Sequence, residues 1–247
     1  MQFSSTFAGL PWYPESKTSY DVLIEQFSIK LEENDKAIVD IPNTALYSPV
    51  SYIPQSLAVF VFRKLGFPPV LIFYLTRMFV LIVWVFTFSI VIKFIPTGKW
   101  VFALLGLLPM SVFVNMSFSA DVVTNILSFL FLSIVLKYKA EPKGYSLKTF
   151  IVLLWIAILL SLAKLVYAPL IFIFLLIPSS SFKSKKQRIV QTLIILLSGF
   201  IFAFFWAFLV NDFYLPYSGY NPLFRDGITL VNCANAEQQL DFVFSNV

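Results

Sequence analysis

Three charged side chains stand inside or beside long apolar stretches of this sequence: Arg77, Asp121 and Lys164. A guanidinium or an ammonium in such surroundings can bind a phosphate or pair with a carboxylate. Tyr167 follows Lys164 by three residues, and this combination suits contact with a lipid-linked phosphate. The alternative is a lysine that snorkels to the membrane surface beside an interfacial tyrosine.

The carboxylate of Asp121 falls at the expected start of a helix, close to Ser119. Either residue could cap that helix, and the helix macrodipole favours a negative charge there. Alternatively, Asp121 binds a cation or a polar acceptor. Tyr47 and Tyr52 could stack on sugar faces, although an aromatic belt at the membrane surface is a common reason for such residues.

The distribution of charge indicates which elements must position these residues. Ten of the eighteen Lys and Arg residues fall in three short connectors between apolar runs, at residues 93–99, 137–148 and 182–188. Only one of the thirteen acidic residues, Glu141, lies in any of them. Apolar runs separated by alternately basic and non-basic connectors are typical of a multi-pass membrane protein. The basic connectors are then predicted in the cytoplasm, and Asp121 and Lys164 at the outer boundary.

Composition points to the same class. Hydrophobic residues make up 59 % of the 247 residues and charged residues 13 %, whereas a soluble domain averages ~25 % charged. The mean hydropathy is +0.83. The net charge of +5 comes from connectors that face anionic lipid, so we expect no nucleic-acid partner. Histidine is absent and Cys233 is the single cysteine, which excludes a Ser-His-Asp triad, a histidine-containing metal site and an intramolecular disulfide.

An all-α fold with about six membrane helices follows from the apolar segments at residues 68–94, 100–118, 119–137, 146–163, 165–178 and 189–211. The second and third must be separate, because a single helix over both would be ~57 Å long. Their break is expected at residues 117–121. The fifth segment is short and contains Pro169, which suits a tilted or partial span buried among its neighbours. A division of the fourth and fifth segments at Lys164 puts all three basic connectors on one side.

Arg77 lies about nine residues into the first segment, roughly 13 Å deep and near the bilayer centre. An arginine there costs at least ~2.5 kcal/mol on insertion scales, so it must face the bundle interior or a wet cavity. It could bind a phosphate or an ion partner. Alternatively, it pairs with backbone carbonyls or with a polar side chain such as Asn115 or Asn125.

We divide the chain into an extracytoplasmic segment at residues 1–67, a transmembrane bundle at 68–211 and an extracytoplasmic tail at 212–247. Residues 21–36 are predicted to form an amphipathic helix. Residues 53–65 are apolar but too few to cross a ~30 Å core, so we expect a helix lying on the outer surface. The amino terminus is then outside without a visible signal peptide, and we interpret the chain as a fragment that lacks a preceding span.

Several short motifs occur in order along the chain: Tyr47-Ser-Pro-Val-Ser-Tyr-Ile-Pro-Gln55, Leu75-Thr-Arg77, Leu108-Pro-Met110 with Ser117-Phe-Ser-Ala-Asp121, Ala163-Lys-Leu-Val-Tyr-Ala-Pro169 and Gln238-Gln-Leu-Asp-Phe242. With them, most of residues 47–242 resembles a bacterial family of predicted multi-pass membrane proteins of unknown function. Members are often found with cell-surface polysaccharide genes. That family in turn resembles the GT-C glycosyltransferases, which move a sugar from a polyprenyl-phosphate carrier to an acceptor outside the membrane.

The resemblance implies a GT-C-like domain in the bacterial cytoplasmic membrane, a polyprenyl-phosphate carrier and a cell-envelope glycan or lipid as acceptor. It puts Arg77, Asp121 and Lys164 at matched positions. In GT-C enzymes an acidic residue of the first outer loop is the general base, and this family usually has an Asp-Glu pair followed by His there. This chain has no such pair with a histidine, so we expect that the catalytic carboxylate is missing. No cofactor is required, although Asp121 could be an oxygen ligand of a divalent cation.

Two other functions are compatible with the sequence. A non-enzymatic transporter or assembly subunit for lipid-linked glycan would show paired broken spans and internal symmetry. A truncated remnant would have no activity.

Overall fold

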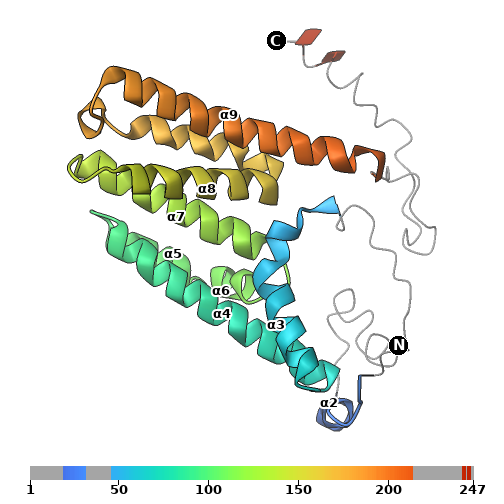
Figure 1. Ribbon diagram of the computed structural model, residues 1–247. Helices are drawn as coiled ribbons and strands as arrows, with labels where there is room; N and C mark the ends of the chain where they lie inside the picture. Colours follow the sequence, from blue (N-terminus) through green and yellow to red (C-terminus); the bar gives the residue numbers. More distant parts are fainter. Residues whose placement is uncertain (1–18, 32–45, 214–240, 243, 246–247) are drawn as a thin grey trace. The chain divides into compact units, whose positions relative to one another are not determined.

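A computed structural model of the chain describes residues 19–31, 46–213, 241–242 and 244–245 (Figure 1). The chain forms two compact units, one of residues 1–39 and 47–209 and the other of residues 40–46 and 210–247. The described residues contain helices and turns but no strand. Three helices are long and apolar enough to cross a membrane: α4 (Pro69–Phe94), α7 (Asp121–Ala140) and α9 (Lys185–Val210). The Gln238 motif and most of the predicted tail lie outside the described residues.

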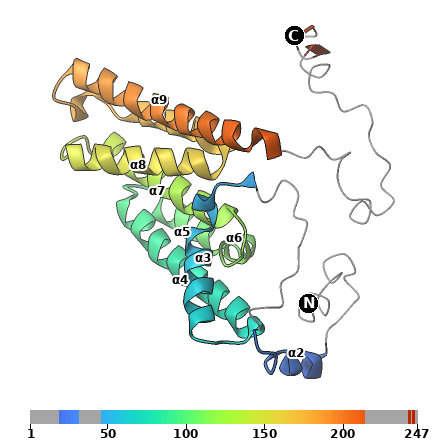
Figure 2. The ribbon, with the colours of Figure 1, turned by 45° about the vertical axis from the view of Figure 1, so that its right-hand side comes forward.

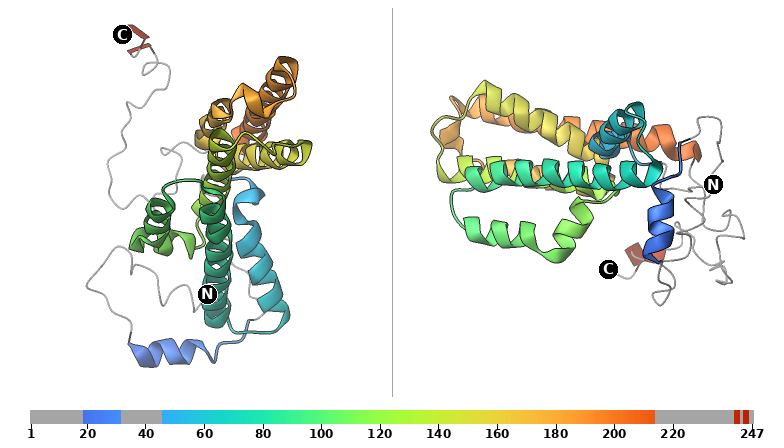
Figure 3. Two further views of the ribbon diagram at one scale, coloured as in Figure 1. Left: turned by 90° about the vertical axis from the view of Figure 1, so that its left-hand side faces the viewer. Right: turned by 90° about the horizontal axis from the view of Figure 1, so that it is seen from below.

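The larger unit places its three basic connectors together. Figures 1 and 3 show that the chain runs alternately between two ends of the bundle, with the connectors after α4, after α7 and before α9 at the same end. We call this the basic end. The start of α7 and the end of α8 (Leu147–Ala163) lie at the opposite end. The predicted division at Lys164 is confirmed, because Lys164 has extended backbone angles that terminate α8.

Most predicted segments coincide with helices within a few residues, although among the described residues only three of these helices, and not six, are long and apolar enough to span a membrane. The segment predicted at residues 100–118 is wrong as a continuous helix. It forms two helices, α5 (Lys99–Leu107) and α6 (Pro109–Asn115), separated at Leu108. The ring of Pro109 disfavours a helical conformation in the preceding residue, and Leu108 is accordingly extended with φ −54° and ψ 136°. The next break, at residues 116–120, matches the predicted one.

The segment with Pro169 is a 3₁₀ helix, η3 (Leu165–Leu176), rather than an α-helix. Proline lacks an N–H and its ring obstructs the α-helical path, which favours another winding. Twelve residues rise ~24 Å in a 3₁₀ helix against ~18 Å in an α-helix. The tighter winding lets a short segment extend farther toward the basic end.

The predicted surface helix is α3 (Ile53–Lys64), which packs beside the first half of α4 (Figures 1 and 2). In Figures 1 and 3, the axis of α3 makes a large angle with the axes of α7, α8 and α9. Its polar Gln55 is buried, whereas apolar residues at helical spacing are exposed: Ile53, Leu57, Phe60 and Val61. Such an apolar face suits lipid rather than water. The helix predicted at residues 21–36 is shorter, since α2 (Tyr20–Gln26) ends in a turn at Phe27.

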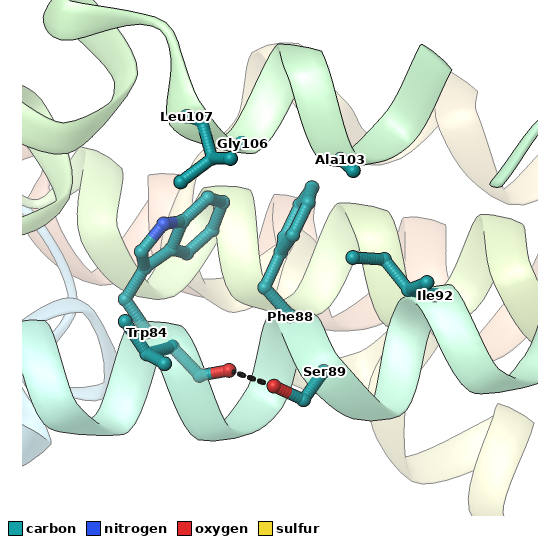
Figure 4. Close-up of a pocket in the computed structure, with 8 residues that line it drawn as sticks. Trp84, Phe88, Ser89, Ile92, Ala103, Gly106 and Leu107 are labelled. Carbon is teal, nitrogen blue, oxygen red and sulfur yellow. Dashed lines mark hydrogen bonds between the residues drawn. The ribbon is translucent and has the colours of Figure 1, made fainter. Parts of the chain in front are cut away.

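A close contact joins α4 to α5. Figure 4 shows Trp84 and Phe88 of α4 pointing toward α5, where Ala103 and Gly106 are small. A Cβ at Gly106 would lie 2.3 Å from a ring carbon of Phe88, so the helices can approach this closely only at a glycine. An apolar groove of about 150 Å³ remains beside them.

The main core lies among α7, α8, η3 and α9. Its fully buried side chains include Phe131, Leu153, Ile171 and Ile195. Gly199 of α9 faces η3, and a Cβ there would lie 2.4 Å from the end of the Ile171 side chain. This core holds the end of α8 against the start of α7, which positions the polar residues described next.

Candidate functional site

Three segments meet at the end of the bundle opposite the basic connectors. Asp121 begins α7, Lys164 follows the last residue of α8, and the segment that carries Tyr47 and Tyr52 leads into α3. We call Tyr47, Tyr52, Asp121 and Lys164 the Asp–Lys cluster. The structure therefore brings together four of the six residues proposed from the sequence, although Asp121 and Lys164 are 43 residues apart along the chain.

An ion pair is the centre of the cluster. The Lys164 Nζ donates a hydrogen bond to Asp121 Oδ1 at 2.5 Å, and the Ser119 hydroxyl donates to Asp121 Oδ2 at 2.8 Å. The side chain of Lys164 is 19 % exposed and that of Asp121 38 %. A pair that is only partly exposed is less weakened by solvent than one on an open surface. Both carboxylate oxygens are engaged, and the ammonium keeps contact with the surface.

Local backbone geometry fixes both partners. Ser119 Oγ accepts a hydrogen bond from the Asp121 amide at 3.1 Å, and the Ser119 amide donates to Ser117 Oγ at 3.0 Å. Ala120 is the residue that precedes α7, so neither Ser119 nor Asp121 occupies the capping position itself. The serine hydroxyls nevertheless orient the turn, as hydroxyls of this type commonly do.

The ammonium of Lys164 stays charged. Partial burial would by itself lower the pKa of Lys164, but the hydrogen bond and the charge of Asp121 outweigh burial, and the pKa is raised. Burial, together with Tyr47, raises the pKa of Tyr52, whereas the nearby Lys164 opposes that rise. Lys164 therefore cannot take up a proton near neutral pH, and its chemistry is that of a fixed cation.

Aromatic groups surround this cation. Lys164 Nζ lies 5.2 Å from the ring centroid of Tyr47, within the range of a cation–π contact. Tyr167 is half-buried against the main core, and its amide donates to the Lys164 carbonyl at 3.0 Å. Its phenol lies near enough to help raise the pKa of Lys164. The tyrosines proposed from the sequence thus line the cation rather than form a separate surface.

Two buried residues that the sequence analysis did not single out hold the cluster together. The hydroxyl of Ser51 donates to the Ala163 carbonyl at 3.0 Å, next to Lys164. The amide of Gln55 donates to the Ser119 carbonyl at 3.1 Å, next to Asp121. Their signal in the sequence was their position in the Tyr47–Gln55 motif, between proline and apolar residues. Among the described residues, Oε1 of Gln55 is buried without a hydrogen-bond partner.

Arg77 is separate from the ion pair. Its Nε donates to the Met116 carbonyl at 3.2 Å, and its guanidinium stands 5.5 Å from the ring of Phe73 and 6.0 Å from that of Phe113. This is the carbonyl-binding alternative given above. Met116 is the first residue of the 116–120 turn that leads into Asp121. Arg77 therefore affects the cluster by fixing the backbone that precedes Asp121.

The amide side chains of Asn115 and Asn125 pair with each other, with Asn125 donating to Asn115 at 3.1 Å. Asn115 also donates to the Ser111 carbonyl at 2.8 Å. This pair joins α6 to α7. Together with Arg77 and Gln55, it fixes the 116–120 turn from three sides.

The described part of the chain contains no group of three His, Cys, Asp or Glu side chains that could hold a metal ion. The cluster provides a fixed cation, an aromatic face and hydrogen-bonding groups. Such a combination can bind a phosphate or another anion that also carries an apolar or sugar group.

The chain belongs to a family of predicted membrane proteins, DUF2142, whose family model matches residues 20–245. The matched region includes α2 to α9 and all the residues of the Asp–Lys cluster. No curated protein and no solved structure matches the chain. The family is described only as membrane proteins, so the chemistry has to be argued from the site.

Proposed function

We propose that this protein is a glycosyltransferase-like membrane protein that acts on lipid-linked sugars during cell-envelope glycan assembly. The donor would be a polyprenyl-phosphate sugar and the acceptor a cell-envelope glycan or lipid. The observation that carries the proposal is the partly buried Lys164, a fixed cation beside Tyr47 at the end of the bundle opposite the basic connectors. The resemblance of this chain's family to the GT-C glycosyltransferases supports the same choice.

The membrane arrangement is part of the proposal. Six segments would cross the bilayer, with α5 and α6 together making the second crossing and η3 the fifth. The basic end would face the cytoplasm of a bacterial cell, because connectors rich in lysine and arginine are retained there. The Asp–Lys cluster would then lie at the outer boundary, next to the start of α3.

In the proposed reaction, the acceptor oxygen forms a bond to the anomeric carbon as the bond from that carbon to the carrier phosphate breaks. The phosphate leaves with additional negative charge, which the Lys164 ammonium stabilises. The acceptor proton passes to a base outside the cluster, because Asp121 is held by Lys164 and Ser119. Asp121 positions the ammonium, and Tyr47 and Tyr52 offer aromatic faces to the sugar.

Binding of a polyprenyl phosphate to the purified full chain tests this proposal. Lys164→Gln should weaken binding by about tenfold or more, because a charge-assisted hydrogen bond contributes ~1.5–3 kcal/mol. Lys99→Gln, which removes an exposed charge at the basic end, should leave binding unchanged. Asp121→Asn should preserve or strengthen binding, because it removes the carboxylate that competes for the ammonium.

A purely structural ion pair gives another pattern. Lys164→Gln and Asp121→Asn would then impair binding equally, because each variant breaks the same pair. If Lys164→Gln binds the carrier as tightly as the wild type, the donor site is not at this cluster. In cells, both variants should reduce surface glycan modification at unchanged protein level.

A second function has support from the two irregular segments. The break between α5 and α6 and the 3₁₀ winding of η3 are the kind of discontinuities found in transporters of lipids and ions. Asp121 and Lys164 lie at the ends of these two segments, so their pair could open and close during transport. A carrier or assembly subunit would move lipid-linked glycan between vesicle leaflets without forming a new glycosidic bond, whereas the enzyme would form one.

A further inference from the structure

A cavity lies at the basic end, among the end of α4, the end of α7 and the start of α8. Its volume is about 210 Å³, well above the roughly 10–15 Å³ that one water needs. Its lining includes two lysines, Lys137 and Lys148, and the aromatic rings of Phe94 and Tyr138. It shares no residue with the Asp–Lys cluster, so it requires an explanation of its own.

The cations of this cavity differ from Lys164 in their partners. Lys137 is half-buried, and its Nζ lies 4.8 Å from the ring of Phe94 and 5.6 Å from that of Tyr138. Within the described ranges, no carboxylate forms an ion pair with Lys137 or Lys148. Two lysines therefore line one cavity without an ion pair to a described carboxylate, and one of them, Lys137, contacts aromatic rings.

The polar lining of the cavity is held in place from behind. The hydroxyls of Tyr138 and Thr149 are 3.1 Å apart and hydrogen-bonded. The rings of Tyr138 and Tyr145 meet edge to face with centroids 5.4 Å apart, and the Tyr145 hydroxyl donates to Gln191 at 2.9 Å. Burial raises the pKa of Tyr145, so this donor keeps its proton. The site is thus arranged before any ligand arrives, which lowers the entropic cost of binding.

We propose that this cavity binds the headgroup of an anionic phospholipid. Lys137 and Lys148 contact the phosphate, and whichever of the bonded Tyr138 and Thr149 hydroxyls does not donate to the other provides one further hydrogen bond. The apolar side chains of Ile134 and Val152 line the same cavity and contact the upper part of an acyl chain. Two neighbouring lysines together with apolar walls favour a lipid over a soluble phosphate. Basic pockets between membrane helices are known to bind lipid headgroups, and this cavity lies between such helices.

This site is independent of the proposed glycosyl transfer. A lipid here would connect α4, α7 and α8, so it would stabilise the bundle whatever reaction the opposite end performs. Removal of the cluster at Asp121 and Lys164 should leave lipid binding unchanged. The two proposals can therefore fail separately.

The test is a titration of the purified full chain in neutral detergent with a phosphatidylglycerol, followed by native mass spectrometry and thermal unfolding. We expect one tightly held phosphatidylglycerol, and weaker binding of a phosphatidylcholine with the same acyl chains. Lys137→Gln and Lys148→Gln should each weaken binding about fivefold, as expected for the loss of ~1 kcal/mol per lysine. Lys137→Arg should retain it.

Lys139→Gln is the matched control, because Lys139 is an exposed lysine of α7 outside the cavity. It should change binding less than twofold. Glycerol phosphate alone should not raise the unfolding temperature. Equal losses in Lys139→Gln and Lys148→Gln would show diffuse attraction to the basic end and overturn the site, as would equal affinity for phosphatidylcholine or for glycerol phosphate. Lys148 is exposed, so its variant decides the outcome even if Lys137→Gln folds poorly.

Discussion

Lysines serve opposite ends of this bundle in different ways. At the Asp–Lys cluster, Lys164 is partly buried, bonded to Asp121 and placed over Tyr47. At the basic end, the ammonium groups of Lys137 and Lys148 border a cavity and, among the described residues, have no carboxylate partner. Removing a lysine ammonium from water costs little free energy when it is paired with a carboxylate in a polar pocket, and the pair fixes its position. Unpaired lysines remain available to bind phosphates.

The supporting structure differs as well. Hydrogen bonds from Ser51, Gln55 and Arg77 to backbone carbonyls define the positions around Asp121 and Lys164. At the basic end, Tyr145 packs edge to face against Tyr138 and at a tilt against Phe182, and both tyrosine hydroxyls form hydrogen bonds. The Asp–Lys cluster thus depends on side-chain hydrogen bonds to the backbone, whereas the basic end combines ring contacts with hydrogen bonds between side chains.

The largest expected effect is on the ion pair itself. Lys164→Gln or Asp121→Asn should each lower the free energy of unfolding by about 1–3 kcal/mol, between the values for exposed and buried pairs, because both groups are partly screened by solvent. The double variant should lose less than the sum of the two. Reversible unfolding in detergent measures this cycle. Additive losses would mean that the pair contributes no coupling.

A smaller loss should follow from removal of the groups behind the pair. Gln55→Leu removes one of two donors from the half-buried Ser119 carbonyl, which keeps only the longer bond from the Val122 amide at 3.4 Å, and should cost about 1 kcal/mol. Ser56→Ala, at the exposed neighbouring position, should change stability by less than ~0.5 kcal/mol. Equal effects of the two variants would contradict the role of Gln55. Thermal unfolding of both proteins in the same detergent gives the comparison.

The pH dependence of stability should separate the two ends. Because the pKa of Lys164 is raised above its ordinary value of ~10.4, its contribution is fully present below that value and is lost as the pH rises through the raised pKa. The difference in unfolding temperature between wild type and Lys164→Gln should therefore be constant from about pH 7 to 9 and shrink above pH 10. A difference that disappears already near pH 8 would show that the pKa is lowered instead.

The smallest effect is expected at the basic end in the absence of lipid. Lys148→Gln should change the free energy of unfolding by less than ~0.5 kcal/mol, because Lys148 is exposed and, in the described part of the chain, makes no ion pair. Added phosphatidylglycerol should then stabilise the wild type more than the variant. A large loss without lipid would show that Lys148 has a structural role like that of Lys164.

Hydropathy and charge predicted much of this fold, but local backbone chemistry was harder to interpret. The helices α4, α7, α8 and α9 follow from apolar runs between charged connectors. The break at Leu108 is caused by Pro109, and a hydropathy pattern does not distinguish proline's effect on the backbone. The 3₁₀ winding of η3 depends on packing against α7 and α8 as well as on Pro169, so no local rule could give it.

The site was predictable in its members but not in its contacts. Asp121, Lys164, Tyr47 and Tyr52 attract attention because charged and aromatic groups are unusual between apolar segments. Their meeting depends on how three segments pack, which a single sequence does not reveal. For Arg77 the sequence predicted the kind of contact: a charged group deep in an apolar segment needs a polar partner, and the Met116 carbonyl is that partner.

The central claim is that the Asp–Lys cluster and the basic end lie on opposite sides of the membrane, with the cluster outside. In a Cys233→Ser background, Val166→Cys tests the cluster end, since Val166 is 84 % exposed beside Lys164, and Ser184→Cys tests the basic end. A membrane-impermeant maleimide should label Val166→Cys in intact cells and label Ser184→Cys only after the membrane is permeabilised. Labelling of Ser184→Cys in intact cells, with Val166→Cys protected, would invert the orientation and contradict the proposed donor site.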